Sequence, residues 1–242
     1  MPLATKNVVA VLLYHSISDN EWGFSTKPKE FEKHIRYLHG NDYRFLNTSD
    51  LLDIISGENR SIKKAVLITF DDGYRDLIEH AIPIMDTYKA KGVVFIHTDR
   101  SSSQLKNSIP LLDWADIESL PETLEVGNHA YSHPDLKKLS VSDLERETEE
   151  STSAIESKVH KKPSAFAYPF GRFTQQTIAI LKANGYKLGF TIDRGTVKIG
   201  DDPFRVKRFG ISRDTSFTEF KARMTSASDW YEKLARVFRN KR

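Results

Sequence analysis

The sequence contains no cysteine among its 242 residues. Disulfide bonds and thiolate ligands are therefore excluded, and any bound metal ion must be held by histidine and carboxylate side chains. An excess of charge of one sign is also lacking, because 36 basic residues nearly balance 33 acidic ones and leave a net charge of +3. This balance provides no general electrostatic field for nucleic acid, so we expect no nucleic-acid partner.

Long hydrophobic runs are lacking as well. The apolar run at residues 8–14 is too short to cross a bilayer, and it lacks a charged start followed by a small-residue cleavage site. We interpret it as the first strand of a core. Without an export signal we expect a cytoplasmic protein or one at the cytoplasmic membrane face, whereas prior removal of a signal peptide would indicate a periplasmic or extracellular location.

Length and composition indicate one domain. Hydrophobic residues make up 39% of the chain and charged residues 29%, which is typical of a globular protein. No repeat or linker divides the sequence, so we expect a single domain over residues 1–242 in which residues 212–242 form a C-terminal helical extension. From Trp230 onward, apolar and basic residues alternate at helical spacing. This segment either packs one stripe on the domain or makes peripheral contact with an anionic membrane.

Strand and helix patterns alternate along the chain. The patterns predict strands at residues 8–15, 65–70, 92–98, 124–126, 165–168, 187–192 and 206–211. They predict helices at residues 28–40, at 51–55 with Ser49 and Asp50 as its cap, at 74–90 with an interruption at Pro83, at 140–160 and at 174–184. Such alternation favours parallel pairing in an open sheet or a closed barrel, and both place functional side chains at the carboxyl ends of the strands. Polar residues at these ends are Asp71, Asp72, His129, Tyr168 and Asp193.

Asp71 and Asp72 follow the apolar strand at residues 65–70. Two adjacent carboxylates repel each other, and a bound cation would offset that repulsion. Neighbouring side chains of an extended chain point in opposite directions, so we expect the two aspartates to have unequal roles. Gly73 allows a sharp turn after them. The same residues would also suit an Asx turn or a helix N-cap, and the pattern by itself leaves both interpretations open.

His129 and His133 are four residues apart. On one helical turn this spacing points both imidazoles in the same direction, which suits a shared metal ion, although a pair of surface or core histidines has the same spacing. Combined with an aspartate at a strand end, the pair favours a site of two histidines and one carboxylate that leaves positions open for water and substrate. Iron oxygenases use a similar ligand set, but they need no second aspartate.

Together these motifs resemble those of one known family. Thr69-Phe70-Asp71-Asp72-Gly73, His129-x-x-x-His133 and Tyr168-Pro169-Phe170-Gly171 resemble the motifs of the polysaccharide deacetylases, which are carbohydrate esterases of family 4 with a NodB homology domain. Leu13-Tyr14-His15-Ser16 is similar to the poly-N-acetylglucosamine deacetylase subgroup. The resemblance implies a distorted (β/α) barrel of about seven parallel strands. It also implies a metal-dependent hydrolase that removes N-acetyl groups from the N-acetylhexosamine residues of a polysaccharide or a lipid-linked glycan.

The resemblance assigns roles to matching residues. Asp71 is expected to be the general base, and Asp72, His129 and His133 are expected to bind a divalent metal ion, most often zinc. The metal would activate water and polarise the acetamide carbonyl. The backbone N–H of Phe170 would help to stabilise the oxyanion that forms.

Two departures from the family pattern affect these roles. Where many members have an arginine that orients the catalytic aspartate, this chain has Tyr168. The histidine that usually protonates the leaving amine is missing from Val206-Lys207-Arg208-Phe209, and arginine donates no proton near neutral pH. We expect His15 to be the acid, with a purely structural histidine as the alternative, and Asp193 either orients that acid or caps the following turn. A second function class is a metal-retaining but catalytically weak carbohydrate-binding protein.

Overall fold

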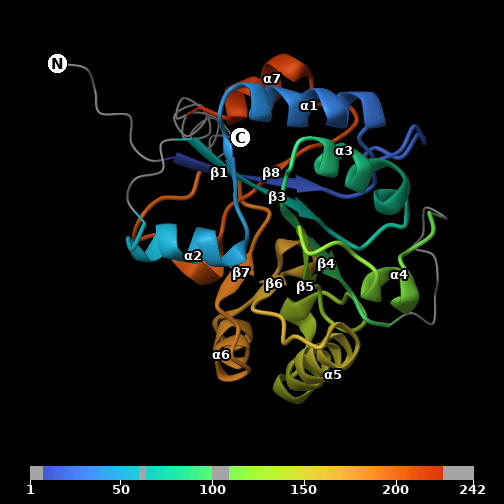
Figure 1. Cartoon of the computed structure of the whole chain (residues 1–242). Helices are drawn as coiled ribbons and strands as arrows, with labels where there is room; N and C mark the ends of the chain where they lie inside the picture. The colour runs from blue at the N-terminus through green and yellow to red at the C-terminus, as the bar shows by residue number, and fades with distance from the viewer. Residues whose placement is uncertain (1–7, 60–63, 100–108, 226–242) are drawn as a thin grey trace, which may run out of the picture.

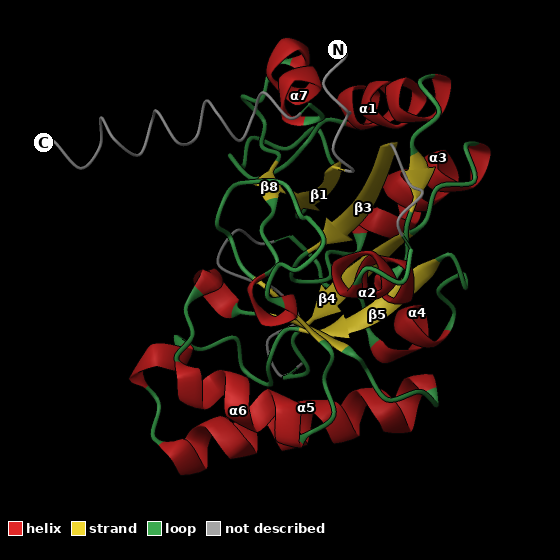
Figure 2. Ribbon diagram, turned by 90° about the vertical axis from the view of Figure 1, so that its left-hand side faces the viewer, coloured by secondary structure: helices red, strands yellow, loops and turns green. Residues whose placement is uncertain are grey.

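A computed structural model describes residues 8–59, 64–99 and 109–225 of the chain as a curled sheet surrounded by helices (Figures 1 and 2). The described strands are β1 (Val8–Tyr14), β2 (Arg44–Phe45), β3 (Lys64–Phe70), β4 (Gly92–Ile96), β5 (Leu124–Asn128), β6 (Ala165–Ala167), β7 (Leu188–Phe190) and β8 (Phe209–Gly210). The described α-helices are α1 (Pro28–Gly40), α2 (Thr48–Ser56), α3 (Ile82–Thr87), α4 (Trp114–Glu118), α5 (Val141–Val159), α6 (Gln175–Ala183) and α7 (Phe217–Arg223).

The strands pair in the order β7-β6-β5-β4-β3-β1-β8, and β2 adds to β3. Every pair between these strands is parallel. The segment around β8 links the two ends of the curled sheet, because Val206 bridges Phe190 on one side and Phe209 pairs with Leu12 on the other. This confirms the distorted barrel, and it carries Arg208, which lies between these two contacts, to the inner side of the sheet.

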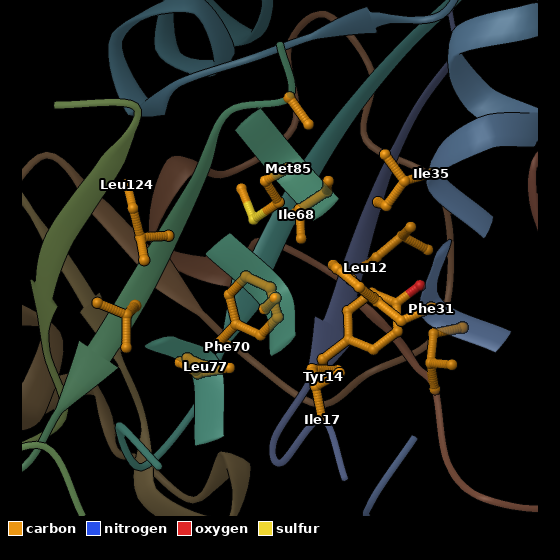
Figure 3. Packing of buried hydrophobic residues seen from close by; sticks show 14 of the residues in the cluster. Leu12, Tyr14, Ile17, Phe31, Ile35, Ile68, Phe70, Leu77, Met85 and Leu124 are labelled. Carbon is orange, nitrogen blue, oxygen red and sulfur yellow. The ribbon is translucent and has the colours of Figure 1, made fainter. Parts of the chain in front are cut away.

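Alternating strand residues form two apolar layers. Val9, Val11 and Phe95 belong to the cluster inside the curled sheet, and α2 adds Leu51 and Ile54 to the same cluster. The neighbouring residues Leu12, Tyr14, Ile68 and Phe70 point the other way and pack with Phe31 and Ile35 of α1 (Figure 3). A third cluster joins β6 to α5 and α6, which lie together on one side of the molecule (Figure 1). The two-residue period of a strand therefore supports a layer on each face of the sheet.

Several predicted elements differ in detail. The helix predicted over residues 74–90 with an interruption at Pro83 is observed as a π-helical turn at Leu77–Ala81 followed by α3, which has Pro83 in its first turn. The cap of α2 is Asn47 rather than the predicted Ser49 and Asp50, because the Asn47 side chain accepts the Asp50 N–H and the Asp50 carboxylate accepts the Asn47 N–H. This reciprocal arrangement is a capping box, and it starts the helix three residues before the predicted range.

The described part of the C-terminal extension packs on α1. Phe220 of α7 stacks on His34 of α1 with ring centroids 3.9 Å apart, and the Tyr43 hydroxyl donates to the carbonyl of Met224 at 3.0 Å. The basic segment from Trp230 lies outside the described residues. Among the residues that the structure describes, no helix is both long and apolar enough to cross a membrane.

Gly127 of β5 provides space for a core ring beneath the site. A Cβ atom added at Gly127 would lie 2.4 Å from the Phe95 ring, whereas one added at Gly210 of β8 would meet nothing within 4 Å. We expect Gly127→Ala to lower the free energy of unfolding by about 1–3 kcal/mol through overpacking. Urea denaturation measures this loss, with Gly210→Ala as a strand-glycine control. Equal losses for the two variants would contradict the packing explanation.

Candidate active site

Four segments bring candidate site residues to the carboxyl end of the curled sheet. Asp71 and Asp72 directly follow β3, and His129 directly follows β5. His15 follows β1, and Pro169–Gly171 form a short helical turn after β6. The structure therefore places the predicted residues of these segments at one end of the sheet, as the strand pattern indicated. The contacts between these side chains define the geometry of the site.

Asp71 forms a buried ion pair with Arg208. The two guanidinium nitrogens Nη1 and Nη2 lie 2.7 and 2.8 Å from the carboxylate oxygens Oδ1 and Oδ2 of Asp71. Arg208 is fully buried, and its Nε donates to the Thr191 carbonyl while Nη1 also reaches Thr69 Oγ1. A bidentate pair of this kind fixes the plane of the carboxylate as well as its position.

This ion pair determines the charge state of Asp71. Burial alone would raise the pKa of Asp71, but the positive charge and hydrogen bonds of Arg208, together with His129, lower that pKa to about 2. Asp71 is therefore a carboxylate at any pH near neutrality. The ion pair with Arg208 thus both orients the Asp71 carboxylate and keeps it ionised.

Asp72, His129 and His133 form a compact group of three ligand atoms. Asp72 Oδ1 lies 3.6 Å from His129 Nε2 and 3.4 Å from His133 Nε2, and one ligand atom from each residue lies within 4.8 Å of the others. Ligands about 2.0–2.1 Å from a tetrahedral zinc ion are separated by about 3.3 Å, so these spacings fit a shared ion. The set can hold a divalent metal ion.

The charge states of this group also suit a cation. Burial raises the pKa of Asp72 to about 6, and the negative charge of Asp71 acts in the same direction. Burial lowers the pKa of His129 to about 3 and also lowers that of His133. Both imidazoles are therefore neutral near pH 7, with lone pairs available to a metal. Asp72 lacks the arginine partner that Asp71 has, so a cation beside Asp72 would stabilise its charged form.

The two histidines lie in a loop rather than on the helical turn predicted from their spacing. No helix covers residues 129–133, and Ala130 and His133 have positive φ angles of 70° and 58°. The loop nevertheless places the ring centroids of His129 and His133 4.7 Å apart. The His129 Nδ1–H donates to the Ala167 carbonyl at 2.7 Å, which leaves Nε2 of that ring to face Asp72.

Glu147 of α5 holds this loop in place. Its Oε2 accepts the backbone N–H groups of Tyr131 and Ser132, both at 2.9 Å, and its Oε1 accepts the Ser132 hydroxyl at 2.6 Å. Asn128 adds a contact at the start of the loop, because its Oδ1 accepts the Ala130 N–H at 2.8 Å. These bonds stabilise a backbone that non-glycine residues rarely adopt.

His15 lies beside both aspartates. Its charge lowers the pKa of Asp72 and, to a smaller extent, that of Asp71, which places it within electrostatic reach of the site. Its Nδ1 is buried without a hydrogen-bond partner in the described part of the chain. The acid role and the structural role predicted for His15 both remain predictions, and its location is compatible with the first.

Phe170 and Tyr168 face opposite directions. Tyr168 is fully buried, with its hydroxyl donating to the Phe204 carbonyl, so it cannot replace an arginine beside Asp71. Phe170 has a positive φ of 57°, and its ring lies edge-on to His133 at 4.7 Å. Among the described residues outside its own helical turn, the Phe170 N–H has no hydrogen-bond partner, and its oxyanion role stays a prediction.

Asp193 is exposed and acts through its backbone. Its N–H donates to Thr191 Oγ1 at 3.1 Å, and its carbonyl accepts the Arg208 N–H at 2.8 Å. No hydrogen bond or ion pair joins Asp193 to His15 within the described ranges. No contact therefore supports the suggestion that Asp193 orients the acid. Its two backbone hydrogen bonds support a local role in the turn before Arg208.

Sequence reasoning missed two residues of the site. Arg208 was considered only as an unsuitable proton donor, yet it provides the cation beside Asp71 that Tyr168 cannot provide. Glu147 lies within a highly charged helix, where nothing distinguishes it from its exposed neighbours Glu149 and Glu150. For Arg208, an arginine next to apolar strand residues was the only available signal.

The comparisons with known proteins identify the family. The model of the polysaccharide deacetylase family matches residues 58–189, more than half of the chain. The chain therefore belongs to the polysaccharide deacetylase family.

Curated relatives extend the match beyond that range. YxkH of Bacillus subtilis is 26% identical over 216 residues, covering 89% of this chain and 76% of YxkH. The poly-beta-1,6-N-acetyl-D-glucosamine N-deacetylase of Staphylococcus epidermidis is 25% identical over 208 residues, covering 82% of this chain and 72% of the relative.

Solved structures confirm the fold. IcaB from Ammonifex degensii superposes with a TM-score of 0.83 at 24% identity, covering 91% of this chain and 98% of the IcaB chain. The Streptococcus pyogenes deacetylase PplD has a TM-score of 0.80 at 24% identity, covering 91% and 99% of the two chains.

The ion pair of Asp71 can be tested by removing Arg208. We expect Arg208→Met to lower the free energy of unfolding at pH 7 by about 3 kcal/mol, because a buried carboxylate is left unpaired. The pKa of Asp71 should rise from about 2 to above its usual value, since burial remains while the cation is gone. Denaturant unfolding and a carboxyl-carbon NMR titration measure the two effects.

The sign of the pH dependence follows from the lowered pKa. A carboxyl whose pKa is lower in the folded than in the unfolded state stabilises the fold above its unfolded pKa, and this contribution is lost as the pH falls through the folded value. The deficit of Arg208→Met should therefore shrink in acid. Arg205→Met, at an exposed arginine of the same segment, is the control. An unchanged Asp71 titration would contradict the assignment.

Proposed function

We propose that the protein is a metal-dependent hydrolase that removes N-acetyl groups from N-acetylhexosamine residues of a glycan. The observation that carries the proposal is the arrangement of the two aspartates. Asp71 is held ionised by Arg208, whereas Asp72 is grouped with two neutral histidines. One carboxylate is thereby available as a base, and the other as a metal ligand.

The donor set favours zinc. Two imidazole nitrogens and one carboxylate oxygen are the ligands of many catalytic zinc sites, which keep a further position open for water. A divalent ion bound there would supply Lewis-acid polarisation of the acetamide carbonyl and lower the pKa of a bound water. A base with a pKa of about 2 is weak, so this acidification of the water is what makes Asp71 useful as a proton acceptor.

The residues of the chain would divide the remaining steps. Asp71 accepts a proton from the attacking water, and Arg208 keeps the carboxylate aimed at it. The Phe170 N–H donates to the oxyanion of the tetrahedral intermediate. His15 donates a proton to the amine nitrogen as the C–N bond breaks, which releases acetate and the free amino sugar. In this scheme His15 replaces the histidine that is missing beside Arg208.

The substrate class follows from the relatives together with the site. The Staphylococcus epidermidis relative is named as a deacetylase of poly-beta-1,6-N-acetyl-D-glucosamine, and it covers most of this chain. A surface polysaccharide of that type is our first choice of substrate. A lipid-linked N-acetyl sugar offers the same reacting group and is the second.

The proposal predicts different outcomes for the two halves of the site. We expect Asp71→Asn to retain metal but to lose at least about 100-fold in acetate release, because the base is removed while the ligands remain. We expect His129→Ala to lose both metal and activity. Acetate release from a panel of N-acetylated glycans and metal content by elemental mass spectrometry give the two measurements.

The control is His39→Ala, which changes an exposed histidine at the end of α1. If the metal-loaded parent protein binds the glycans but releases no acetate from any of them, it is a carbohydrate-binding protein and the hydrolase proposal fails. Loss of metal in Asp71→Asn would reverse the roles assigned to the two aspartates.

The loop that carries both histidines gives a further prediction. We expect Glu147→Ala to weaken zinc binding about 10- to 100-fold, because Tyr131 and Ser132 lose the acceptor that holds the loop between the two ligands. Competition with a chromogenic chelator measures this affinity. Glu150→Ala, at an exposed position of the same helix, should bind zinc as the parent does. Equal zinc affinity in Glu147→Ala would show that the loop holds its shape without this residue.

A further inference from the structure

Two exposed phenyl rings lie against histidines of the site. Phe24 is 55% exposed and Phe170 54% exposed, among the large hydrophobic side chains that the structure describes. The Phe24 ring lies 5.2 Å from the His15 ring, and the Phe170 ring lies 4.7 Å from the His133 ring. Exposed apolar surface beside a reactive site marks a surface that binds something.

Trp22 enlarges the apolar surface on the His15 side. Its ring lies 5.3 Å from Phe24, 5.7 Å from His15 and 5.3 Å from Tyr74. Tyr74 in turn lies close enough to Asp72 to lower the pKa of its carboxyl. We call Trp22 and Phe24 the aromatic platform. It is continuous with the site through two neighbours, His15 and Tyr74.

The loop that carries the platform is held by its own hydrogen bonds. The Thr26 N–H donates to the Ser16 carbonyl at 2.9 Å, and the Ser18 N–H donates to the Thr26 carbonyl at 3.0 Å, which closes the loop at its base. Asp76 accepts the Ser16 hydroxyl at 2.5 Å and the Ile17 N–H at 3.1 Å. Phe24 is therefore exposed on a fixed loop.

Arg213 holds the tip of the same loop from outside. Its Nη2 lies 2.7 Å from Glu21 Oε1, its Nη1 donates to the Asn20 carbonyl, and its backbone N–H donates to the Gly23 carbonyl at 3.1 Å. These bonds flank Trp22 in the sequence. A loop tied at both its base and its tip presents a surface that is organised before any ligand arrives.

The chemistry of the reaction identifies what would cover this surface. The acetyl carbon of the substrate must lie between Asp71 and the group formed by Asp72, His129 and His133. The amine nitrogen must point to His15, which donates its proton. The sugar ring is attached to that nitrogen, so it extends past His15 toward the platform. A pyranose ring has a face of C–H groups that suits an aromatic ring and hydroxyls at its edge that suit water.

We propose that Trp22 and Phe24 bind the pyranose rings of the glycan on the amine side of the acetamide bond that is cleaved. The proposal rests on the function proposed above and extends it from the reacting group to the sugar that carries it. Phe24 is the residue to change, because it is exposed and contacts His15 only from outside. Trp22 also touches Tyr74, so its replacement would disturb Asp72.

Binding can be measured without turnover. In an Asp71→Asn, zinc-loaded background, we expect Phe24→Ala to raise the Kd for a β-1,6-linked N-acetylglucosamine tetramer by about fivefold or more. Phe24→Tyr should keep the parent Kd because it retains the flat ring. Phe24→Leu should weaken binding, since it is apolar but has no flat face. Calorimetry gives the Kd values.

Two controls distinguish loss of the aromatic platform from a general loss of protein structure. Ile199 is also exposed, at 44%, but Gly200 beside it bonds to Ile55 of α2 at the far end of the barrel. Ile199→Ala should leave the Kd unchanged. Acetate, followed by NMR titration, should bind Phe24→Ala as it binds the parent, because the acetyl position does not touch the platform.

A tetramer Kd for Phe24→Ala within about twofold of the parent value overturns the proposal, as does failure of the Asp71→Asn protein itself to bind the tetramer. Acetate release distinguishes this failure from failure of the proposed function. If Phe24→Ala loses binding while the metal-loaded parent with intact Asp71 releases no acetate, the platform stands and the hydrolase proposal fails. If the parent releases acetate and Phe24→Ala does so with an unchanged KM, the platform fails and the hydrolase proposal stands.

Discussion

Arg208 and Asp71 form an ion pair inside the curled sheet, where water cannot solvate either charge. Taking both charges out of water is costly, and the cost is offset only when every donor and acceptor is satisfied. Each guanidinium nitrogen of Arg208 has an acceptor here, since Arg208 also donates to Thr191 and Thr69. The rings of Phe95 and Phe190 lie 5.7 and 5.9 Å from the guanidinium, and Gly127 leaves room for the first of them. The ion pair of Arg208 and Asp71 thus lies among the aromatic and apolar side chains of the barrel interior.

The difference between the two aspartates follows from this pair. They are adjacent in sequence and both are buried, yet the pKa of Asp71 is lowered and that of Asp72 is raised. Only Asp71 has an arginine, and the positive φ of 71° at Asp72 turns the second carboxylate away toward the two histidines. A single backbone angle and a single cation therefore place two adjacent carboxylates in different environments. The difference expected from extended-strand geometry has a specific structural cause.

The sequence predicted those parts of the site that are encoded locally. Asp71, Asp72 and His129 stand directly after apolar strands, and Phe170 lies in the turn after β6. The alternation of patterns predicted parallel strands, and the family resemblance implied the barrel. The helical turn for the two histidines was wrong, because the loop conformation is set by Glu147 and Asn128 rather than by spacing.

Arg208 could not be assigned from the sequence for a related reason. Whether an arginine is buried and paired depends on the strand that lies opposite, and its partner Asp71 is 137 positions away. The π-helical turn before α3 could not be predicted, because the apolar spacing of residues 74–90 does not distinguish an α-helix from a π-helical turn joined to one. Cap choice at α2 also required the observed contacts, since Asn47 and Ser49 have similar propensities.

The closing segment at residues 206–210 links the site to the order in which the chain is made. Asp71, Asp72, His129 and His133 all precede this segment in sequence, so a ribosome supplies the two aspartates and the two histidines well before Arg208. Until Val206 and Phe209 join β7 to β1, the Asp71 carboxylate has no arginine beside it and the curled sheet is not closed. A nascent chain therefore contains Asp72, His129 and His133 before Asp71 has its buried partner, and the arrangement of the site is complete only when the last strand is in place.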